Sequence, residues 1–296
     1  MLKQILLTLL LFSTMPAWAD DCGLDAYVKK DYAAALKPAT ECAKQGSAGA
    51  QGLLGFMYSN GQGVPRDYKA AVRWYTLSAE QGNDAAQMNL GSMYGLGLGV
   101  PQDDKAAAHW VTLAAKQGNA SAQYGLGLMS RDGLGVLQDY KAAVRWYTKA
   151  AEQGFAEAQY NLGEMYRKGE GAPQDYKAAL HWYTLSAGHG YAAAQTVLGA
   201  MHNDGKGVPQ DYKAAVRWYT LSAEQGDAFA QTVLGRAYAT GEGVPQDDVK
   251  AYKWFNLAAA EGNADAKKFK AIVETQMTPA QIAEAQKLSS EWKPTK

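Results

Sequence analysis

The chain has few cysteines and prolines, no excess charge of either sign and no long apolar segment. Only two of its 296 residues are cysteine and nine are proline, which excludes a disulfide-rich mini-protein and a collagen-like or proline-rich chain. Its 29 basic residues balance 29 acidic ones without any basic run, so nucleic acid is not an expected partner. Apolar residues make up 47% of the chain and glycine is abundant, with 31 residues. This composition indicates a globular protein.

The apolar run from Ile5 to Met15 is shorter than the roughly 18 to 20 residues that a membrane-spanning helix needs. Lys3 precedes the run, Pro16 ends it, and Ala17-Trp18-Ala19 places small residues where a signal peptidase reads them. We therefore predict a signal peptide over residues 1–19, no membrane span, and a periplasmic or secreted mature protein. Removing Lys3 leaves 28 basic and 29 acidic residues, a net charge of −1.

Export gives the two cysteines a role, because an oxidising compartment lets thiols pair. Cys22 and Cys42 are twenty positions apart and are predicted to form a structural disulfide. Lipid attachment at Cys22 is rejected, since Trp18-Ala19-Asp20-Asp21 lacks the small apolar residues that should precede a lipoprotein cysteine.

A 36-residue period runs through most of the chain. Tryptophan recurs at this interval six times: Trp74, Trp110, Trp146, Trp182, Trp218 and Trp254. A proline and a pair of loop glycines keep the same phase, as Pro65, Gly61 and Gly63 do in one copy. A fixed period of this length is the signature of a repeat architecture.

Each copy is predicted to form two helices. In one copy, residues 84–95 contain Ala-Gln-x-x-Leu-Gly-x-Met-Tyr, whose apolar positions recur at helical spacing. We call this the first helix. The second helix, over residues 67–81, opens with an N-capping Asp67 and stops at Gly82. A glycine inside each first helix, such as Gly55, predicts a close helix crossing with the Trp74 and Tyr75 rings packed over it.

Leu-Gly-x-x-Tyr followed by an alanine-rich second helix matches part of the tetratricopeptide signature. The period of 36 residues, with its Gly-x-Gly-Val-Pro-x-Asp-Tyr loop, is longer than that of the tetratricopeptide repeat. In these features residues 21–275 resemble the Sel-one-like repeat (SLR) family of tetratricopeptide-like proteins. The resemblance implies an all-α fold, a right-handed superhelix of antiparallel helix pairs, which acts as a scaffold for protein interaction.

The ends of the array should differ from its middle, because each must cover an otherwise bare face. We expect a degenerate capping unit over residues 20–46, repeats over 47–262, and C-terminal capping helices over 263–296. Thr278 and Pro279 are predicted to open the last helix.

No catalytic, metal or cofactor site is predicted. The four histidines, His109, His181, His189 and His202, replace other residues at repeat positions, and no two have a metal-binding spacing within one helix. The Gly-x-Gly loops lack the preceding strand and following Lys-Ser or Lys-Thr of a phosphate loop.

Variation between copies indicates where a partner could bind. Three positions of the first helix, with offsets of four and three, vary sharply and share one face. In a superhelix of this kind that face would line a concave groove. The expected partner-binding residues are Met88, Tyr124, Leu128, Arg131, Tyr160, Glu164, Arg167 and Arg236. Drift on a solvated face explains the same variation equally well.

Two hypotheses follow. The first is an exported, monomeric, non-enzymatic scaffold that binds a protein or peptide in the cell envelope or at a host interface. The second is a hydrolase of β-lactam or peptidoglycan-like substrates, since some cysteine-rich members of the resembling family are described as β-lactam-binding. Those members carry a cysteine pair in each repeat, whereas this chain has one pair and is expected to have none of the Ser-x-x-Lys, Ser-Asp-Asn and Lys-Thr-Gly motifs of serine β-lactamases.

Overall fold

The computed structural model describes residues 22–295, and the predicted signal peptide lies outside them. Over the described residues the chain is all-helical, with sixteen helices and no strand. It forms two compact units, the first ending at Phe155 and the second beginning at Ala156.

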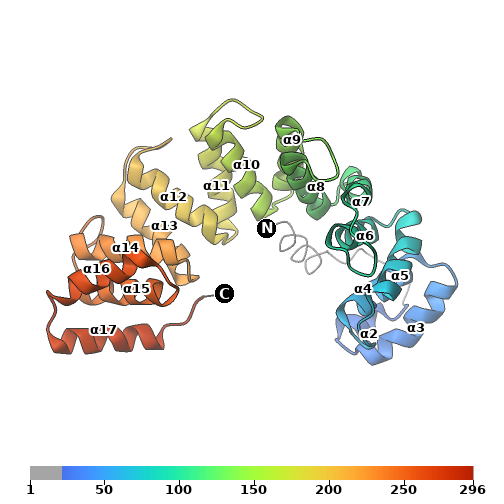
Figure 1. Ribbon diagram of the computed structural model, residues 1–296, viewed down its shortest axis with the longest axis horizontal. Helices are drawn as coiled ribbons and strands as arrows, with labels where there is room; N and C mark the ends of the chain where they lie inside the picture. Colours follow the sequence, from blue (N-terminus) through green and yellow to red (C-terminus); the bar gives the residue numbers. More distant parts are fainter. Residues whose placement is uncertain (1–21, 296) are drawn as a thin grey trace. The chain divides into compact units, whose positions relative to one another are not determined.

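Unit 1 contains eight helices, coloured blue to green in Figure 1. They are α2 (Leu24–Val28), α3 (Tyr32–Lys44), α4 (Ala48–Asn60), α5 (Tyr68–Glu80), α6 (Asp84–Leu96), α7 (Asp104–Lys116), α8 (Ala120–Asp132) and α9 (Tyr140–Glu152). Unit 2 contains α10 (Ala156–Lys168), α11 (Tyr176–Gly188), α12 (Ala192–Asp204), α13 (Tyr212–Glu224), α14 (Ala228–Thr240), α15 (Asp248–Ala260), α16 (Ala264–Glu274) and α17 (Pro279–Glu291).

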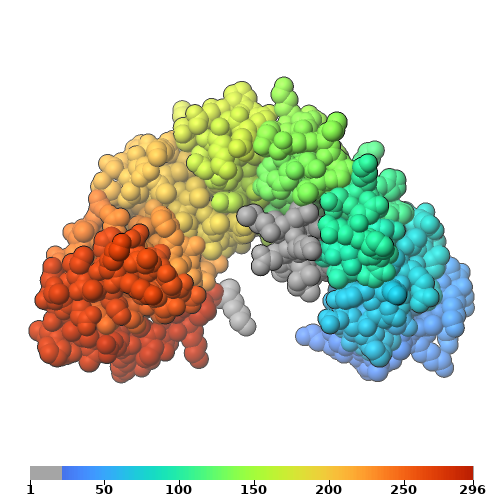
Figure 2. All heavy atoms as spheres, viewed as in Figure 1, coloured from blue at the N-terminus to red at the C-terminus, as the bar shows by residue number. Residues whose placement is uncertain are grey.

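Within each unit a helix packs mainly against the helices before and after it in the chain, except that α17 packs against α15. The first helices are α4, α6 and α8 in unit 1 and α10, α12 and α14 in unit 2, and each is followed by its second helix. Figure 2 shows neighbouring helix pairs of one unit in contact through their side chains. The prediction of a 36-residue helix-pair solenoid is confirmed.

Local sequence explains where these helices begin and end. The side chain of Asp67 accepts a hydrogen bond from the Ala70 amide at 3.0 Å, which caps α5 as predicted. At the other end of the repeat, Gly61 ends α4 with a φ of 70°, a left-handed conformation that glycine adopts without steric cost. Pro65 then separates this turn from the next cap.

The glycine inside each first helix allows a close helix crossing. A Cβ added to Gly55 would lie 2.6 Å from Cδ1 of Tyr75, and one added to Gly163 would lie 2.8 Å from Cε1 of Tyr183. The Tyr75 ring therefore fills this space as expected, but Trp74 is not among the atoms nearest to Gly55 and is only half-buried. Of the two neighbouring rings, that of Tyr75 lies against Gly55 and is buried in the core.

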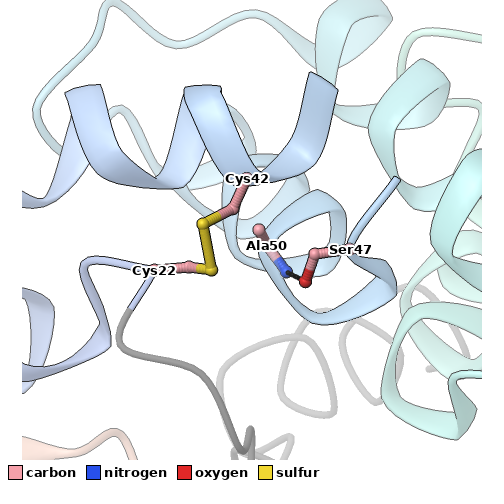
Figure 3. The surroundings of a disulfide bond; sticks show 4 residues. All are labelled: Cys22, Cys42, Ser47 and Ala50. Atoms are coloured by element: carbon pink, nitrogen blue, oxygen red, sulfur yellow. Dashed lines mark hydrogen bonds between the residues drawn. A yellow bond between two sulfur atoms is a disulfide. The ribbon is translucent and has the colours of Figure 1, made fainter. Parts of the chain in front are cut away.

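Additional contacts cover the two ends of the array. Figure 3 shows the disulfide between Cys22 and Cys42, which ties the segment before α2 to α3 across a Cα–Cα distance of 5.9 Å. At the C-terminal end, α17 starts as predicted with Thr278 as its N-cap and Pro279 in its first turn, and Gln281 completes a capping box. Trp292 then packs edge-on against Trp254, with ring centroids 6.5 Å apart.

Candidate partner-binding surface

We define the variable face as the three varying positions of the first helices, which are Tyr160, Glu164 and Arg167 in α10 and the residues 36 positions before or after them in the other copies. The structure buries Met88, Tyr124 and Leu128. The other five predicted binding residues keep accessible surface: Arg131, Tyr160, Glu164 and Arg167 are half-buried, and Arg236 is exposed.

A group of aromatic rings surrounds the variable face of α8 in unit 1. The Tyr124 ring lies 5.9 Å from the ring of Tyr147 on α9 and 5.1 Å from that of Phe155, measured between centroids. At the end of α8, Arg131 forms two hydrogen bonds to the carboxylate of Asp132, at 2.7 and 2.8 Å. The Asp132 hydrogen bonds raise the pKa of Arg131 above its usual value, so its charge is permanent.

The same ring arrangement recurs 36 residues later in unit 2. The Tyr160 ring on α10 lies 5.8 Å from the ring of Tyr183 on α11 and 5.3 Å from that of Tyr191 before α12. Burial raises the pKa of Tyr160 to about 12, so its hydroxyl is neutral near pH 7. We call Tyr160, Glu164, Arg167, Tyr183 and Tyr191 the Tyr160 cluster.

Glu164 holds the charged part of this cluster together. Its carboxylate accepts hydrogen bonds from Nε and Nη2 of Arg167 at 2.9 and 2.7 Å, and from the Tyr183 hydroxyl at 2.5 Å. The Nζ atom of Lys168 lies 3.4 Å from Oε2 of Glu164. Burial alone would raise the pKa of Glu164, but the hydrogen bonds from Arg167 and Tyr183 outweigh it and lower that pKa. Glu164 is therefore a charged brace that orients Arg167.

Tyr191 and Phe155 were not expected as site residues, although the sequence contains a signal for them. They occupy the position that precedes each first helix, where other copies have a capping residue: Ser47, Asn83, Asn119, Asp227 and Asn263. Tyr191 makes no side-chain capping bond, and phenylalanine has no atom that could make one. In both copies the ring instead packs on the variable face.

The repeat explains the positions of three of the four histidines, whereas the Nδ1 atom of the fourth, His202, is buried without a hydrogen-bond partner. The Nδ1 atom of His189 lies 3.0 Å from Oε1 of Gln159, where Gln81 contacts Gln51 in an earlier repeat at 2.7 Å. His109 and His181 are exposed beside the tryptophans that follow them. Over residues 22–295 no group of three or more His, Cys, Asp or Glu side chains could hold a metal ion.

One tetrapeptide bears on the hydrolase hypothesis. Residues 290–293 read Ser-Glu-Trp-Lys, a match to the Ser-x-x-Lys pattern of serine β-lactamases. Ser290 is exposed at the end of α17, and its hydroxyl donates to the backbone carbonyl of Lys287 at 2.8 Å. The expectation that no Ser-x-x-Lys motif is present was therefore wrong, but the serine is hydrogen-bonded to its own helix and does not line the pockets around Tyr94, Tyr219 and His202.

The described helices contain no stretch with the length and apolar character that crossing a membrane requires.

Arg236, the last of the predicted residues, places its guanidinium 5.7 Å from the ring centroid of Phe269 on α16.

Comparison with known proteins agrees with this architecture. The Sel1 repeat model matches six consecutive segments: residues 48–83, 84–119, 120–155, 156–191, 192–227 and 228–263. A Sel1 repeat protein from Oxalobacter formigenes is 38% identical, with a TM-score of 0.73 over 82% of this chain and 73% of that one. A protective antigen with an SLR fold, from uropathogenic Escherichia coli strains, is 32% identical, with a TM-score of 0.57 over 90% of this chain and 66% of that one. No curated protein matches the chain.

Proposed function

The chain belongs to the Sel1 repeat family, and on that premise we propose that it is a non-enzymatic scaffold that binds a segment of a partner protein through the variable face. Repeats of this family commonly serve as protein-interaction scaffolds. The observation that carries the proposal for this chain is the Tyr160 cluster. It joins aromatic rings to a braced arginine on an accessible surface.

The energetics of the cluster favour a binding role over drift. A residue that cannot cap a helix costs about 1 kcal/mol at this position relative to Ser, Asn or Asp. Tyr191 makes no capping bond, and its ring packs against Tyr160 instead. Aromatic and arginine side chains are the residues that contribute most to protein interfaces. A rigid pair of rings next to an oriented guanidinium loses little conformational entropy when a partner binds.

The partner we propose is an extended segment or helix of another protein that the scaffold meets after export. The disulfide at the N-terminal end supports an oxidising compartment, the periplasm or the cell exterior. Monomeric scaffold molecules in the envelope or at a host interface are the form that we expect to bind it. The hydrolase hypothesis has no comparable support, because the Ser290 hydroxyl donates to the backbone of its own helix and lines none of the three described pockets.

Affinity capture from envelope and culture fractions tests the proposal. The bait is the chain from residue 20 onward, compared with a Tyr160→Ala/Arg167→Ala variant. A Tyr140→Ala/Arg145→Ala variant is the matched control, since it removes the same residue types from exposed positions of α9, outside the variable face. Loss of two anchors should weaken binding of a specific partner at least about 30-fold, corresponding to about 2 kcal/mol.

We expect the control variant to capture the same partner as the unmodified chain, and the Tyr160→Ala/Arg167→Ala variant to lose it. Equal capture by all three baits contradicts a role for the cluster. Turnover of a chromogenic β-lactam that one substitution abolishes would replace the scaffold with the hydrolase.

A further inference from the structure

A cavity of about 280 Å³ opens on the variable face of unit 2, between α12, α13 and α14. Ala200 and Asn203 of α12 and Arg236 of α14 line it, and all three occupy varying positions of the first helices. Its size is at the lower end of the range for ligand pockets, which suits one large side chain better than a whole cofactor.

The cavity exists because this repeat lacks a side chain that the others have. Ala237 lines it and stands where the five preceding copies have methionine: Met57, Met93, Met129, Met165 and Met201. In the preceding repeat the Met201 side chain extends under the loop, with its Cε 3.2 Å from where a Cβ on Gly207 would lie. Alanine at 237 leaves that volume empty, and Ala200 on α12 does not fill it from the other side.

The cavity ends at a polar atom that has no partner. Tyr219 lines it and is only 4% exposed, yet among the described residues its hydroxyl makes no hydrogen bond. The equivalent hydroxyls are engaged: that of Tyr75 lies 3.4 Å from Ser59 Oγ, and that of Tyr183 donates to Glu164. The Tyr219 hydroxyl is not one of the fully buried polar atoms of the described residues, so it keeps accessible surface at the cavity, where a ligand hydroxyl can form a hydrogen bond with it.

Charge and shape at the cavity favour a neutral, aromatic occupant. Burial, together with the nearby charge of Asp204, raises the pKa of Tyr219 to about 12, while Arg236 acts to lower it, so opposite charges flank the hydroxyl. Asp204 is already paired with Lys206 at 3.1 Å. At the entrance Phe229 is 56% exposed, an aromatic ring that an incoming ring could pack against.

We propose that this cavity, which we call the Tyr219 pocket, binds a tyrosine side chain of the partner protein. The incoming ring packs against Phe229 and the apolar walls formed by Val216, Val233 and Ala237. Its hydroxyl exchanges a hydrogen bond with that of Tyr219. A phenylalanine would leave the Tyr219 hydroxyl unpaired, and a lysine would bring a second cation close to Arg236. The proposal rests on the proposed function, because it assumes that a protein segment lies on the variable face.

The test uses N-acetyl-tyrosine amide and N-acetyl-phenylalanine amide as probes, titrated into the folded chain and followed by NMR. Ala237→Met should weaken the tyrosine probe at least about tenfold, because it fills the cavity with the residue found in five other repeats. Its melting temperature should not fall, which separates loss of the pocket from loss of the fold. Tyr219→Phe should weaken the tyrosine probe about tenfold, the effect of one hydrogen bond, and leave the phenylalanine probe unchanged.

Arg167→Ala is the control that separates this proposal from the proposed function. It lies in the Tyr160 cluster, so it should leave probe binding unchanged while reducing partner capture. The pocket is disproved if the tyrosine probe does not bind saturably, or if Ala237→Met leaves its binding unchanged. Either result would still allow partner capture through the Tyr160 cluster, so the two failures are distinguishable.

Discussion

At the scale of single residues, five of the six repeats depend on a contact between a glycine and an aromatic ring, and in the remaining one Gly91 faces Val111. Gly163 of α10 approaches Tyr183 of α11 so closely that a Cβ would lie 2.8 Å from the ring. Tyr183 is fully buried, so its ring has no free space into which to move. Glycine inside a helix costs about 1 kcal/mol relative to alanine, and the close crossing it permits compensates for that cost.

We expect Gly163→Ala to lower the free energy of unfolding by about 1–3 kcal/mol, because overpacking outweighs the better helix propensity of alanine. The matched control is Gly188→Ala at the end of α11, where an added Cβ meets no atom within 4 Å. That variant should gain about 0.4–1 kcal/mol. Urea denaturation measures both, and a stabilised Gly163→Ala would show that Tyr183 can move aside.

At the scale of elements, the first helices differ in whether a side chain caps their N-terminus. The described first helices α4, α6, α8 and α14, like α16, begin with a Ser, Asn or Asp side chain bonded to a backbone amide. Phe155 before α10 and Tyr191 before α12 break this pattern. Phe155 places its ring beside Tyr124, and Tyr191 contributes a ring to the Tyr160 cluster, so both exceptions coincide with the variable face.

Asn263 offers the simplest test of what a cap contributes here, since its Oδ1 accepts from the Ala266 amide at 3.0 Å. Asn263→Ala should destabilise α16 by about 1 kcal/mol. Asn263→Asp should stay within a few tenths of a kcal/mol of wild type, because aspartate keeps the acceptor and Asp227 serves in the equivalent place. Hydrogen exchange of residues 264–274 reports the difference, and equal protection in all three proteins would mean that packing alone holds the helix.

At the scale of the whole molecule, the contact pattern makes stability a local property. Each helix except α17, which packs on α15, packs mainly on its neighbours in the chain, so a change in one repeat reaches distant repeats only weakly. The disulfide is therefore expected to stabilise only the N-terminal end of the array. It joins Cys22 to Cys42, and the residues around it form a core cluster with α4.

Reducing the disulfide should lower the protection of residues 22–60 against hydrogen exchange by about 3 kcal/mol, the chain-entropy value for a loop of this length. Residues 156–291 should be unaffected. A Cys22→Ser/Cys42→Ser variant should reproduce the result without a reductant. Uniform loss of protection along the chain would show instead that the array unfolds as one cooperative body.

The sequence by itself determined the period, the helix pairs, the caps and the disulfide partners. These features depend on short-range rules: Asp67 caps a helix only three residues away, and Gly61 turns the chain at its own φ. It also indicated which first-helix face varies, and Tyr160, Glu164 and Arg167 are close together because they share one helix.

Only the tertiary structure decided what that face can do. The partners of Tyr160 and Glu164 come from α11 and from the residue before α12, and the Tyr219 pocket needs small residues on two different helices. Burial and cavity volume are set by residues that meet across helix pairs, and a pattern within one helix does not specify them. Met57, Met93, Met129, Met165 and Met201 made Ala237 visible as an exception, but only packing showed that its missing side chain leaves a cavity above an unpaired hydroxyl.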